Sequence, residues 1–200
     1  MSRSMERLAI VPAFAALLLL AAACGGDSTD GNEGDGAAAA GPFGSACSEV
    51  PASGAGSFEG MMTEPIVTAA SANPLLSSLV ADIELAGLTD TLNTAANLTV
   101  FAPSNAAFEA AAAADPEGMD AMMADPTGDF ADLLAYHVVE GQLAPDELAG
   151  EHTSLQGSSL SVEGEGEEFT VNGSAEVVCG DIHTDNANVY IIDEVLHPEA

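Results

Sequence analysis

Basic side chains are almost absent from this 200-residue chain, which has two Lys and Arg residues against 32 Asp and Glu. The two are Arg3 and Arg7, so the chain beyond residue 7 contains neither Lys nor Arg. Proteins bind nucleic acids by neutralising phosphates with these side chains, and many bind anionic lipid surfaces in the same way. The composition therefore excludes nucleic-acid binding and excludes adsorption to anionic lipid through a basic patch.

This uncompensated acidity has a consequence for stability. All acidic residues except Glu6 lie beyond the two arginines, and like charges at this density destabilise a folded chain at low salt. The Debye length falls from about 10 Å at 0.1 M salt to about 3 Å at 1 M, so salt should relieve most of the repulsion. We expect a protein adapted to saline or alkaline surroundings. The alternative is that the carboxylates gather Ca²⁺ or Mg²⁺.

Motifs for catalysis are missing as well. The sequence contains no G-x-S-x-G nucleophile elbow, no phosphate-binding glycine loop and no H-E-x-x-H zinc motif, and its four histidines are scattered. We therefore expect a protein that is not an enzyme, with no cofactor and no dedicated metal centre.

The first 23 residues are typical of a bacterial lipoprotein signal peptide. Arg3 and Arg7 form a positive start, and an apolar run follows over residues 8–23 that is short for a membrane span. The run ends in Leu-Ala-Ala-Ala-Cys, which resembles a lipoprotein cleavage site, so Cys24 should become the first mature residue and carry the lipid. We expect an exported protein anchored by Cys24 to the outer face of the cell membrane. Ordinary cleavage nearby, leaving Cys24 as a free thiol, is the alternative.

Residues 24–46 are predicted to be a disordered acidic tether. Gly and Ala dominate the stretch, and hardly any of its side chains could join a hydrophobic core. A flexible chain of about 22 residues spans roughly 25 Å, which would hold a domain just clear of the lipid. Residues 47–200 then have the length of one domain.

Residues 98–114 combine a strand, a sharp turn and a helix. We expect a short buried strand over residues 98–101, a helix N-cap at Ser104 and a helix over residues 105–114. Phe101 and Phe108 are expected to enter one core.

Helices are expected before the strands that follow. Two are predicted at residues 64–72 and 74–86, and two more after the Asp-Pro pairs at 115–116 and 125–126. Met119, Met122 and Met123 recur at helical spacing and should face the core. Strands are expected near residues 138–139, 153–155, 160–162, 169–171, 176–179 and 188–195. Helices early and strands late predict an α+β domain.

Three blocks of this sequence carry a family resemblance. T-V-F-A-P-S-N-A-A-F at residues 99–108, Y-H-V-V-E-G-Q-L at 136–143 and D-E-V-L-H-P at 193–198 resemble the signature blocks and closing strand of the fasciclin (FAS1) domain. The match covers residues 57–199 and is similar, within the family, to the small secreted and lipid-anchored fasciclin antigens of mycobacteria. It implies the FAS1 fold, a wedge-like β-sandwich with helices packed along it, and a function in adhesion or surface interaction.

Cys47 and Cys179 are the two cysteines left if Cys24 carries lipid. An even pair in an exported protein favours a disulfide. The mycobacterial antigens that the chain resembles have cysteines at both matching positions, which implies the same pairing. Closing a loop of about 130 residues should stabilise the fold by up to roughly 5 kcal/mol in the chain-entropy model. Two free thiols are the alternative.

Tyr136 and His137 are the candidate binding residues. In animal fasciclin proteins the matching region is linked to integrin-mediated adhesion, so the resemblance implies a binding role for this pair. A structural role is the alternative, because such residues at a helix-to-strand junction commonly bury their rings and satisfy backbone groups with their polar tips.

One oxygen-rich turn is a candidate for weak cation binding. It contains Asp181, His183, Asp185 and Asn188 but lacks the glycine and terminal Glu of an EF-hand loop. We expect at most a low-affinity Ca²⁺ site there, with a solvated acidic loop as the alternative. The glutamates at positions 163, 165, 167 and 168 are expected at the exposed tip of a hairpin.

These features together predict a lipid-anchored extracellular fasciclin-domain protein that mediates adhesion or binds a surface protein or glycan. Two other functions stay open. One is a sensory or regulatory surface module, since bacterial fasciclin proteins can occur near anti-sigma systems. The other is an acidic scaffold that gathers divalent cations.

Overall fold

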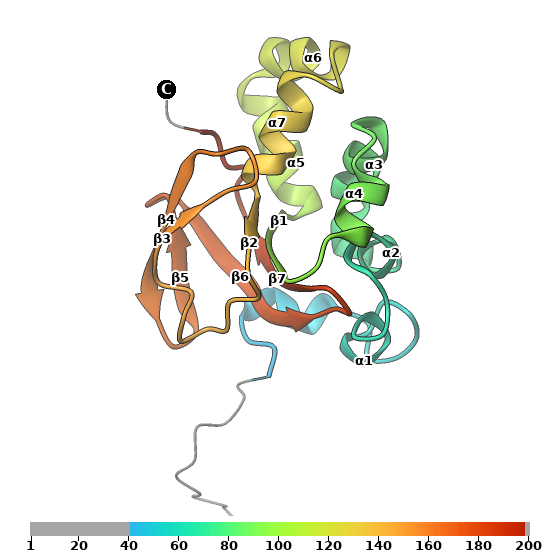
Figure 1. Cartoon of the computed structure of the whole chain (residues 1–200), viewed down its shortest axis with the longest axis vertical. Helices are drawn as coiled ribbons and strands as arrows, with labels where there is room; N and C mark the ends of the chain where they lie inside the picture. The colour runs from blue at the N-terminus through green and yellow to red at the C-terminus, as the bar shows by residue number, and fades with distance from the viewer. Residues whose placement is uncertain (1–40, 199–200) are drawn as a thin grey trace, which may run out of the picture. The chain divides into compact units, whose positions relative to one another are not determined.

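The chain passes through most of its helices before most of its strands, with one strand among the helices (Figure 1). The computed structural model describes residues 41–198. The expected signal peptide, Cys24 and most of the expected tether lie outside these residues. The helices are η1 (Ser45–Glu49), α1 (Phe58–Met61), α2 (Ile66–Ser71), η2 (Pro74–Leu76), α3 (Ser77–Leu85), α4 (Thr89–Thr94), α5 (Asn105–Ala114), α6 (Pro116–Ala124) and α7 (Asp129–Tyr136). The strands are β1 (Leu98–Pro103), β2 (Val138–Glu140), β3 (Gly150–Thr153), β4 (Ser159–Glu165), β5 (Glu168–Val171), β6 (Ala175–His183) and β7 (Ala187–Ile192).

The seven strands form one mixed sheet that bends back on itself. Their order is β2-β1-β7-β6-β5-β4-β3; β1 and β7 are parallel, and the other neighbours are antiparallel. A bridge between Val139 of β2 and Ser154, just after β3, brings the two ends of the sheet together. Helices α2 to α7 lie on the side of β1 and β7 that faces away from β3, β4 and β5 (Figure 1). The predicted α+β class and the helix-covered sandwich are confirmed.

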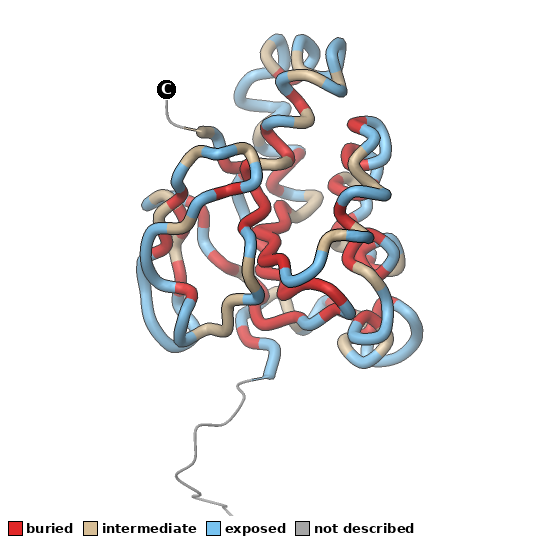
Figure 2. The backbone as a smooth tube through the Cα atoms, in the orientation of Figure 1, coloured by how far each residue is buried: buried red, intermediate tan, exposed pale blue. Residues whose placement is uncertain are grey.

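Strands β1 and β7 separate two hydrophobic cores. Every residue of both strands is buried, as Figure 2 shows for the centre of the domain. Side chains alternate between the faces of a strand, so Val100 packs with the helices while Phe101 packs inside the bent sheet. Phe108 on α5 belongs to the helix-side core. The expectation that Phe101 and Phe108 share one core is therefore wrong, because the strand points Phe101 away from the helix that follows it.

Two predicted helix starts are confirmed and a third is shifted. Ser104 accepts a hydrogen bond from the Ala107 N–H, and Asp115 accepts one from the Gly118 N–H, so each caps its helix as expected. Asp125 instead closes a turn, in which its backbone carbonyl accepts from the Gly128 N–H, and α7 begins only at Asp129. The delay arises because residues 125–128 form their own turn before the helix.

Helices α2 and α3 have no capping side chain of their own and are capped by asparagines from elsewhere. Asn186 accepts from the Ile66 N–H at the start of α2 (2.9 Å), and its amide donates to the carbonyls of Leu92 and Ala95 (both 2.7 Å). Asn105 of α5 accepts from the Ser78 N–H at the start of α3 (2.9 Å). These bonds satisfy helix-end groups that local sequence leaves open, and they fix how the helices sit on the sheet.

Two further expectations are corrected by the structure. The strand expected at residues 153–155 lies earlier, as β3, because Ser154 bonds to the Ser158 carbonyl through both its N–H and its hydroxyl and so closes a turn. Met119 is buried and Met122 half-buried, but Met123 is 42% exposed. The α6 helix lies at the outer end of the helical layer (Figure 1), and Met119 is its only buried residue.

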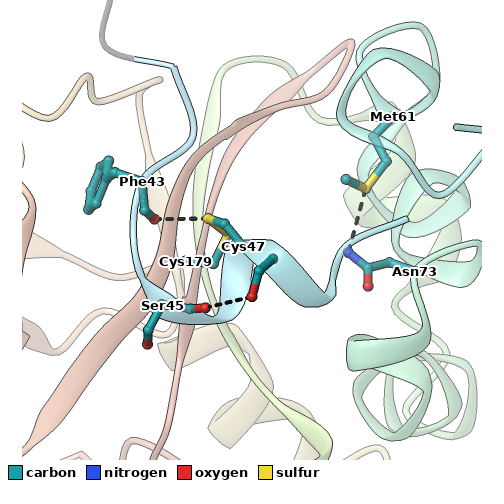
Figure 3. The surroundings of a disulfide bond; sticks show 7 residues. Phe43, Ser45, Cys47, Met61, Asn73 and Cys179 are labelled. Carbon is teal, nitrogen blue, oxygen red and sulfur yellow. Dashed lines mark hydrogen bonds between the residues drawn. A yellow bond between two sulfur atoms is a disulfide. The ribbon is translucent and has the colours of Figure 1, made fainter. Parts of the chain in front are cut away.

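A disulfide joins Cys47 of η1 to Cys179 of β6, the pairing expected from the sequence (Figure 3). The packed chain already begins before Cys47: Phe43 is buried, its backbone pairs with Gly180, and its ring lies beside Phe169 and Tyr190. Gly180 leaves room for that ring, since a Cβ there would collide with it. The boundary expected between residues 46 and 47 therefore falls too late, because Phe43 is a core residue within a stretch of tether-like composition.

Candidate functional site

Tyr136, the last residue of α7, is completely buried in the core inside the bent sheet. Its hydroxyl donates to the Ser159 carbonyl (3.0 Å) and accepts from the side-chain amide of Asn172 (2.9 Å). Both hydrogen-bonding capacities of the phenol are thus used inside the protein, where they tie α7 to β4 and to the turn after β5.

His137 follows at the C-cap of α7 and is only 2% exposed. Its Nε2 accepts from the Leu196 N–H (2.9 Å), so the ring carries its proton on Nδ1, which donates to the Leu133 carbonyl (2.8 Å). Burial, the largest effect, lowers the pKa of His137 to about 4. The ring is therefore neutral at pH 7 and fastens the segment after β7 to the end of α7.

The three fasciclin-like blocks are hydrogen-bonded to one another. Thr99, in the first block, donates to the Gly141 carbonyl (2.6 Å) and accepts from the Leu143 N–H (2.9 Å), both in the second block. His137, in the second block, holds Leu196 in the third. Blocks that are far apart in sequence thus meet in one buried assembly, and their polar side chains serve that assembly. The structure thus places Tyr136 and His137 in the interior, with 0% and 2% of their surfaces exposed.

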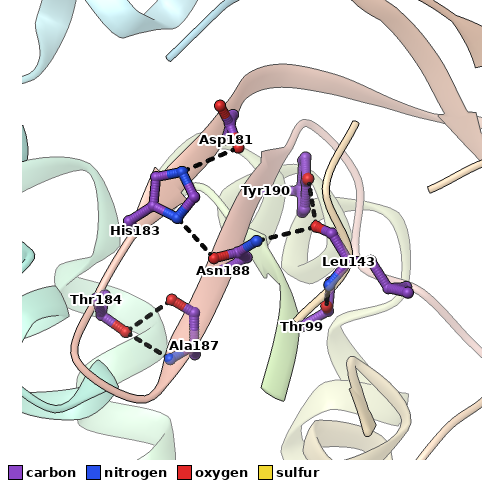
Figure 4. A network of polar contacts seen from close by, with 8 residues as sticks. All are labelled: Thr99, Leu143, Asp181, His183, Thr184, Ala187, Asn188 and Tyr190. Atoms are coloured by element: carbon purple, nitrogen blue, oxygen red, sulfur yellow. Dashed lines mark hydrogen bonds and ion pairs between the residues drawn. The ribbon is translucent and has the colours of Figure 1, made fainter. Parts of the chain in front are cut away.

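The oxygen-rich turn forms a chain of contacts rather than a cage (Figure 4). His183 bridges Asp181 and Asn188, with its Nε2 3.2 Å from Asp181 Oδ1 and its Nδ1 2.8 Å from Asn188 Oδ1. The amide of Asn188 and the hydroxyl of Tyr190 both donate to the Leu143 carbonyl (3.0 and 2.8 Å). The network therefore joins β6, β7 and the loop after β2.

Asp181 sits in an irregular part of β6 with a positive φ of 57°, next to a register shift between β6 and β7. Burial raises the pKa of Asp181, while the neighbouring His183 acts in the opposite direction. Burial also raises the pKa of Tyr190, and the carboxylates of Asp181 and Asp146 add to this effect. The Tyr190 hydroxyl thus stays protonated and donates its hydrogen bond.

The candidate cation ligands do not converge on one point. The Asp185 side chain is exposed, and its backbone N–H donates to the Glu64 carbonyl. The side-chain oxygen of Asn188 is already hydrogen-bonded to His183 Nδ1. Across residues 41–198, no three His, Cys, Asp or Glu side chains lie close enough to hold a metal ion. The four glutamates at the β4–β5 turn are exposed on a hairpin, as expected.

Sequence reasoning missed two adjoining hollows along α5. One, of about 430 Å³, lies between α5, α6 and residues 193–197, and the other, of about 550 Å³, lies between the start of α5, η1 and the end of β7. Asp193 lines both. The available signal was the run of alanines over residues 110–114, which predicted only a helix. Within the described part of the chain, no helix is both long and apolar enough to cross a membrane.

Comparisons with known proteins agree with the geometry. The sequence profile described as the fasciclin domain matches residues 74–198. The cell surface glycolipoprotein MPT83 of Mycobacterium tuberculosis is 44% identical over 154 residues, which are 74% of this chain and 66%, just under two thirds, of that relative. The immunogenic protein MPB70 of Mycobacterium bovis is 41% identical over 172 residues, 82% of this chain and 86% of the relative. A solved FAS1 domain pair from the insect cell adhesion molecule fasciclin I has the same fold, with a TM-score of 0.62 at 17% identity over 70% of this chain and 53% of that one.

Proposed function

The chain belongs to the fasciclin family, and on that premise we propose that it is a binding module of the cell surface. In this proposal the protein is exported, is anchored through lipid on Cys24 to the outer face of the cell membrane, and mediates adhesion by binding a surface protein or glycan. It performs no catalysis.

The observation that carries the proposal is the 44% identity to proteins named cell surface glycolipoproteins. Identity at this level over 154 residues supports a common placement as well as a common fold. The Leu-Ala-Ala-Ala-Cys sequence ending at Cys24 supports the lipid anchor independently.

The geometry favours binding over chemistry for a separate reason. Tyr136 and His137 are the most distinctive polar residues of the second block. Both form their hydrogen bonds with groups inside the fold. A general base must reach the proton that it removes, and a ring that is 2% exposed with both nitrogens occupied does not reach a substrate. Function is thus left to the outer surface, which is the part of an adhesion module that contacts its partner.

The anchor is tested by expressing the full chain in a bacterial host and following it by detergent-phase partitioning and metabolic labelling with an alkyne fatty acid. The wild type should enter the detergent phase and take up label, while Cys24→Ser should do neither. Ser28→Ala, four residues further along, is the matched control and should behave as the wild type. Labelling that survives Cys24→Ser would contradict the anchor.

Adhesion is tested with cells that display the full chain, using their own envelope proteins and envelope glycans as separate bait, with calcium or with EDTA. Capture that is equal in the two conditions would support adhesion. Calcium-dependent stability without capture would support the acidic scaffold instead. Failure to capture either bait, with the protein shown to be folded and displayed, would overturn the proposal.

A further inference from the structure

The two hollows along α5 make one continuous face. Phe108 anchors the inner side of α5 in the helix-side core, and Ala106, Ala110 and Ala113 on the opposite side are exposed. The larger part of the floor of the first hollow is apolar and mostly small, and consists of Ala107, Ala110, Ala111, Ala114, Met119, Met122 and Val195. Small side chains let another backbone approach α5 closely.

The rim of this face is acidic on both sides. Glu194, Asp193 and Asp115 border the first hollow, and Glu49 and Glu109 border the second. All five side chains are exposed. The rim of the first hollow also includes one histidine, His197.

Two of the rim carboxylates are partly engaged within the fold. Asp115 accepts from the Gly118 N–H (2.9 Å) and Asp193 from the Glu176 N–H (2.7 Å), each through one oxygen. Within residues 41–198 their second oxygens accept no hydrogen bond. The face therefore combines an apolar floor with a negative rim, which is complementary to an apolar surface flanked by cations.

Residues 8–200 of this protein do not supply the complementary charge. Beyond residue 7 the chain contains no Lys or Arg, so neither a second copy nor its own tether sequence, which is acidic, can supply the cations. The occupant must be another molecule that carries both apolar and basic side chains. A ten-residue helix such as α5 is roughly 15 Å long, which matches about three turns of a partner helix laid alongside it.

We propose that this face of α5 docks a basic amphipathic helix of another protein, with its apolar side on the alanine and methionine floor and its Lys or Arg side chains over the rim carboxylates. This rests on the proposed function, because it specifies the face and the partner chemistry through which the module binds. The binding should weaken with salt, since the rim charges are exposed to solvent.

The test uses the whole chain from residue 24 with Cys24→Ser, which keeps detergent out of the assay, and a synthetic helix of about 14 residues with Leu on one side and Lys on the other. A scrambled peptide of the same composition controls for general attraction to an acidic protein. By isothermal titration at low salt, the amphipathic peptide should bind at least about tenfold more tightly than the scrambled one. Equal binding of the two peptides, or no binding, would overturn the inference.

Two single-charge variants on one helix locate the site. Ala110 lies in the first hollow, whereas Ala112 is exposed on α5 outside both hollows. Arg is a good helix former, so Ala110→Arg and Ala112→Arg should both fold, which circular dichroism checks. Ala110→Arg should lower the affinity for the amphipathic peptide about tenfold, because the arginine blocks the floor and repels the lysines of the peptide. Ala112→Arg should lower this affinity less than about twofold. Equal losses would mean that only the net charge matters and would refute the site.

Mapping the bound peptide by amide chemical shifts gives a second readout that needs no variant. The shifts should concentrate in α5, α6 and residues 193–197. Shifts concentrated at the acidic β4–β5 hairpin would contradict the proposal. In the adhesion assay, capture unchanged by Ala110→Arg would remove this inference while leaving the proposed function standing. If the wild type itself captures no partner, the proposed function is overturned as well.

Discussion

Replacing His137 with glutamine should remove one contribution to the pH dependence of this domain's stability. His137 is neutral in the fold because burial lowers its pKa from 6.5 to about 4, whereas in the unfolded chain it titrates near 6.5. Between these values the unfolded state binds the extra proton, so the stability contributed by His137 rises with pH across that window. It is complete above about pH 6.5 and is lost as the pH falls toward 4.

The magnitude follows from the two pKa values. One unit corresponds to about 1.4 kcal/mol, so protonation should remove about 3 kcal/mol of stability between pH 7 and pH 4. The physical reason is that a protonated Nε2 can no longer accept the hydrogen bond from the Leu196 N–H (2.9 Å). For a domain of this size, 3 kcal/mol corresponds to a fall in Tm of roughly 10 °C.

The assay compares free energies of unfolding by urea for the wild type and His137→Gln at a series of pH values. Absolute stabilities also contain other titrations. Burial raises the pKa of Asp82 to about 6, so its protonation favours the fold as the pH falls, and discharge of the other carboxylates relieves repulsion. The informative quantity is therefore the difference between the two proteins at each pH, in which those contributions cancel.

At pH 7 the variant should be the less stable protein, because it loses well-placed buried hydrogen bonds that each contribute about 1 kcal/mol. Toward pH 4 the difference should shrink by about 3 kcal/mol, so that the two curves meet or cross. His152→Gln is the matched control. Its ring also faces a carbonyl four residues earlier, that of Leu148, but is only partly buried. A wild-type minus His137→Gln difference that stays constant from pH 7 to pH 4 would refute the reasoning.

Three further outcomes are expected. Asn186→Ala leaves the Ile66 N–H and the Leu92 and Ala95 carbonyls without their partner, so urea unfolding should show a loss of about 3 kcal/mol or more, and a loss below about 1 kcal/mol would contradict the capping role. Removing the Cys47–Cys179 disulfide by the double Ala variant should cost about 3–5 kcal/mol because 132 residues separate the two cysteines, and reduction of the wild type should reproduce that loss. Calorimetry should show that Tm rises between 0.05 M and 1 M NaCl, because salt screens the acidic charges. CaCl₂ at equal ionic strength should give no additional rise. A Tm that does not change with NaCl would contradict self-repulsion.

The Phe43 segment shows how composition can conceal a core residue. Its neighbours are Gly, Pro, Ala and Ser, and the average composition of this stretch indicates a tether. One phenylalanine nevertheless reaches the sheet because Gly180 makes room for its ring and the disulfide four residues later holds the segment in place. Gly180 and the partner cysteine Cys179 both lie more than 130 residues away, so no local pattern could reveal them.

The sequence by itself determined what depends on neighbours along the chain. Ser104 and Asp115 cap helices whose open N–H groups lie within three residues of them, and the apolar runs of β1 and β7 identify strands buried on both faces. The absence of Lys and Arg beyond residue 7 is likewise read without coordinates, and it predicts that nucleic acids are not bound.

Tertiary structure alone decided which distant groups complete one another. Asn186 caps a helix 120 residues earlier, His137 holds a backbone N–H 59 residues later, and the outer face of α5 lies open between acidic side chains from three parts of the chain. A buried polar group costs free energy unless it finds a partner, but any of many partners could satisfy it. Periodicity shows that such a residue is buried, and only the packed chain shows what it touches.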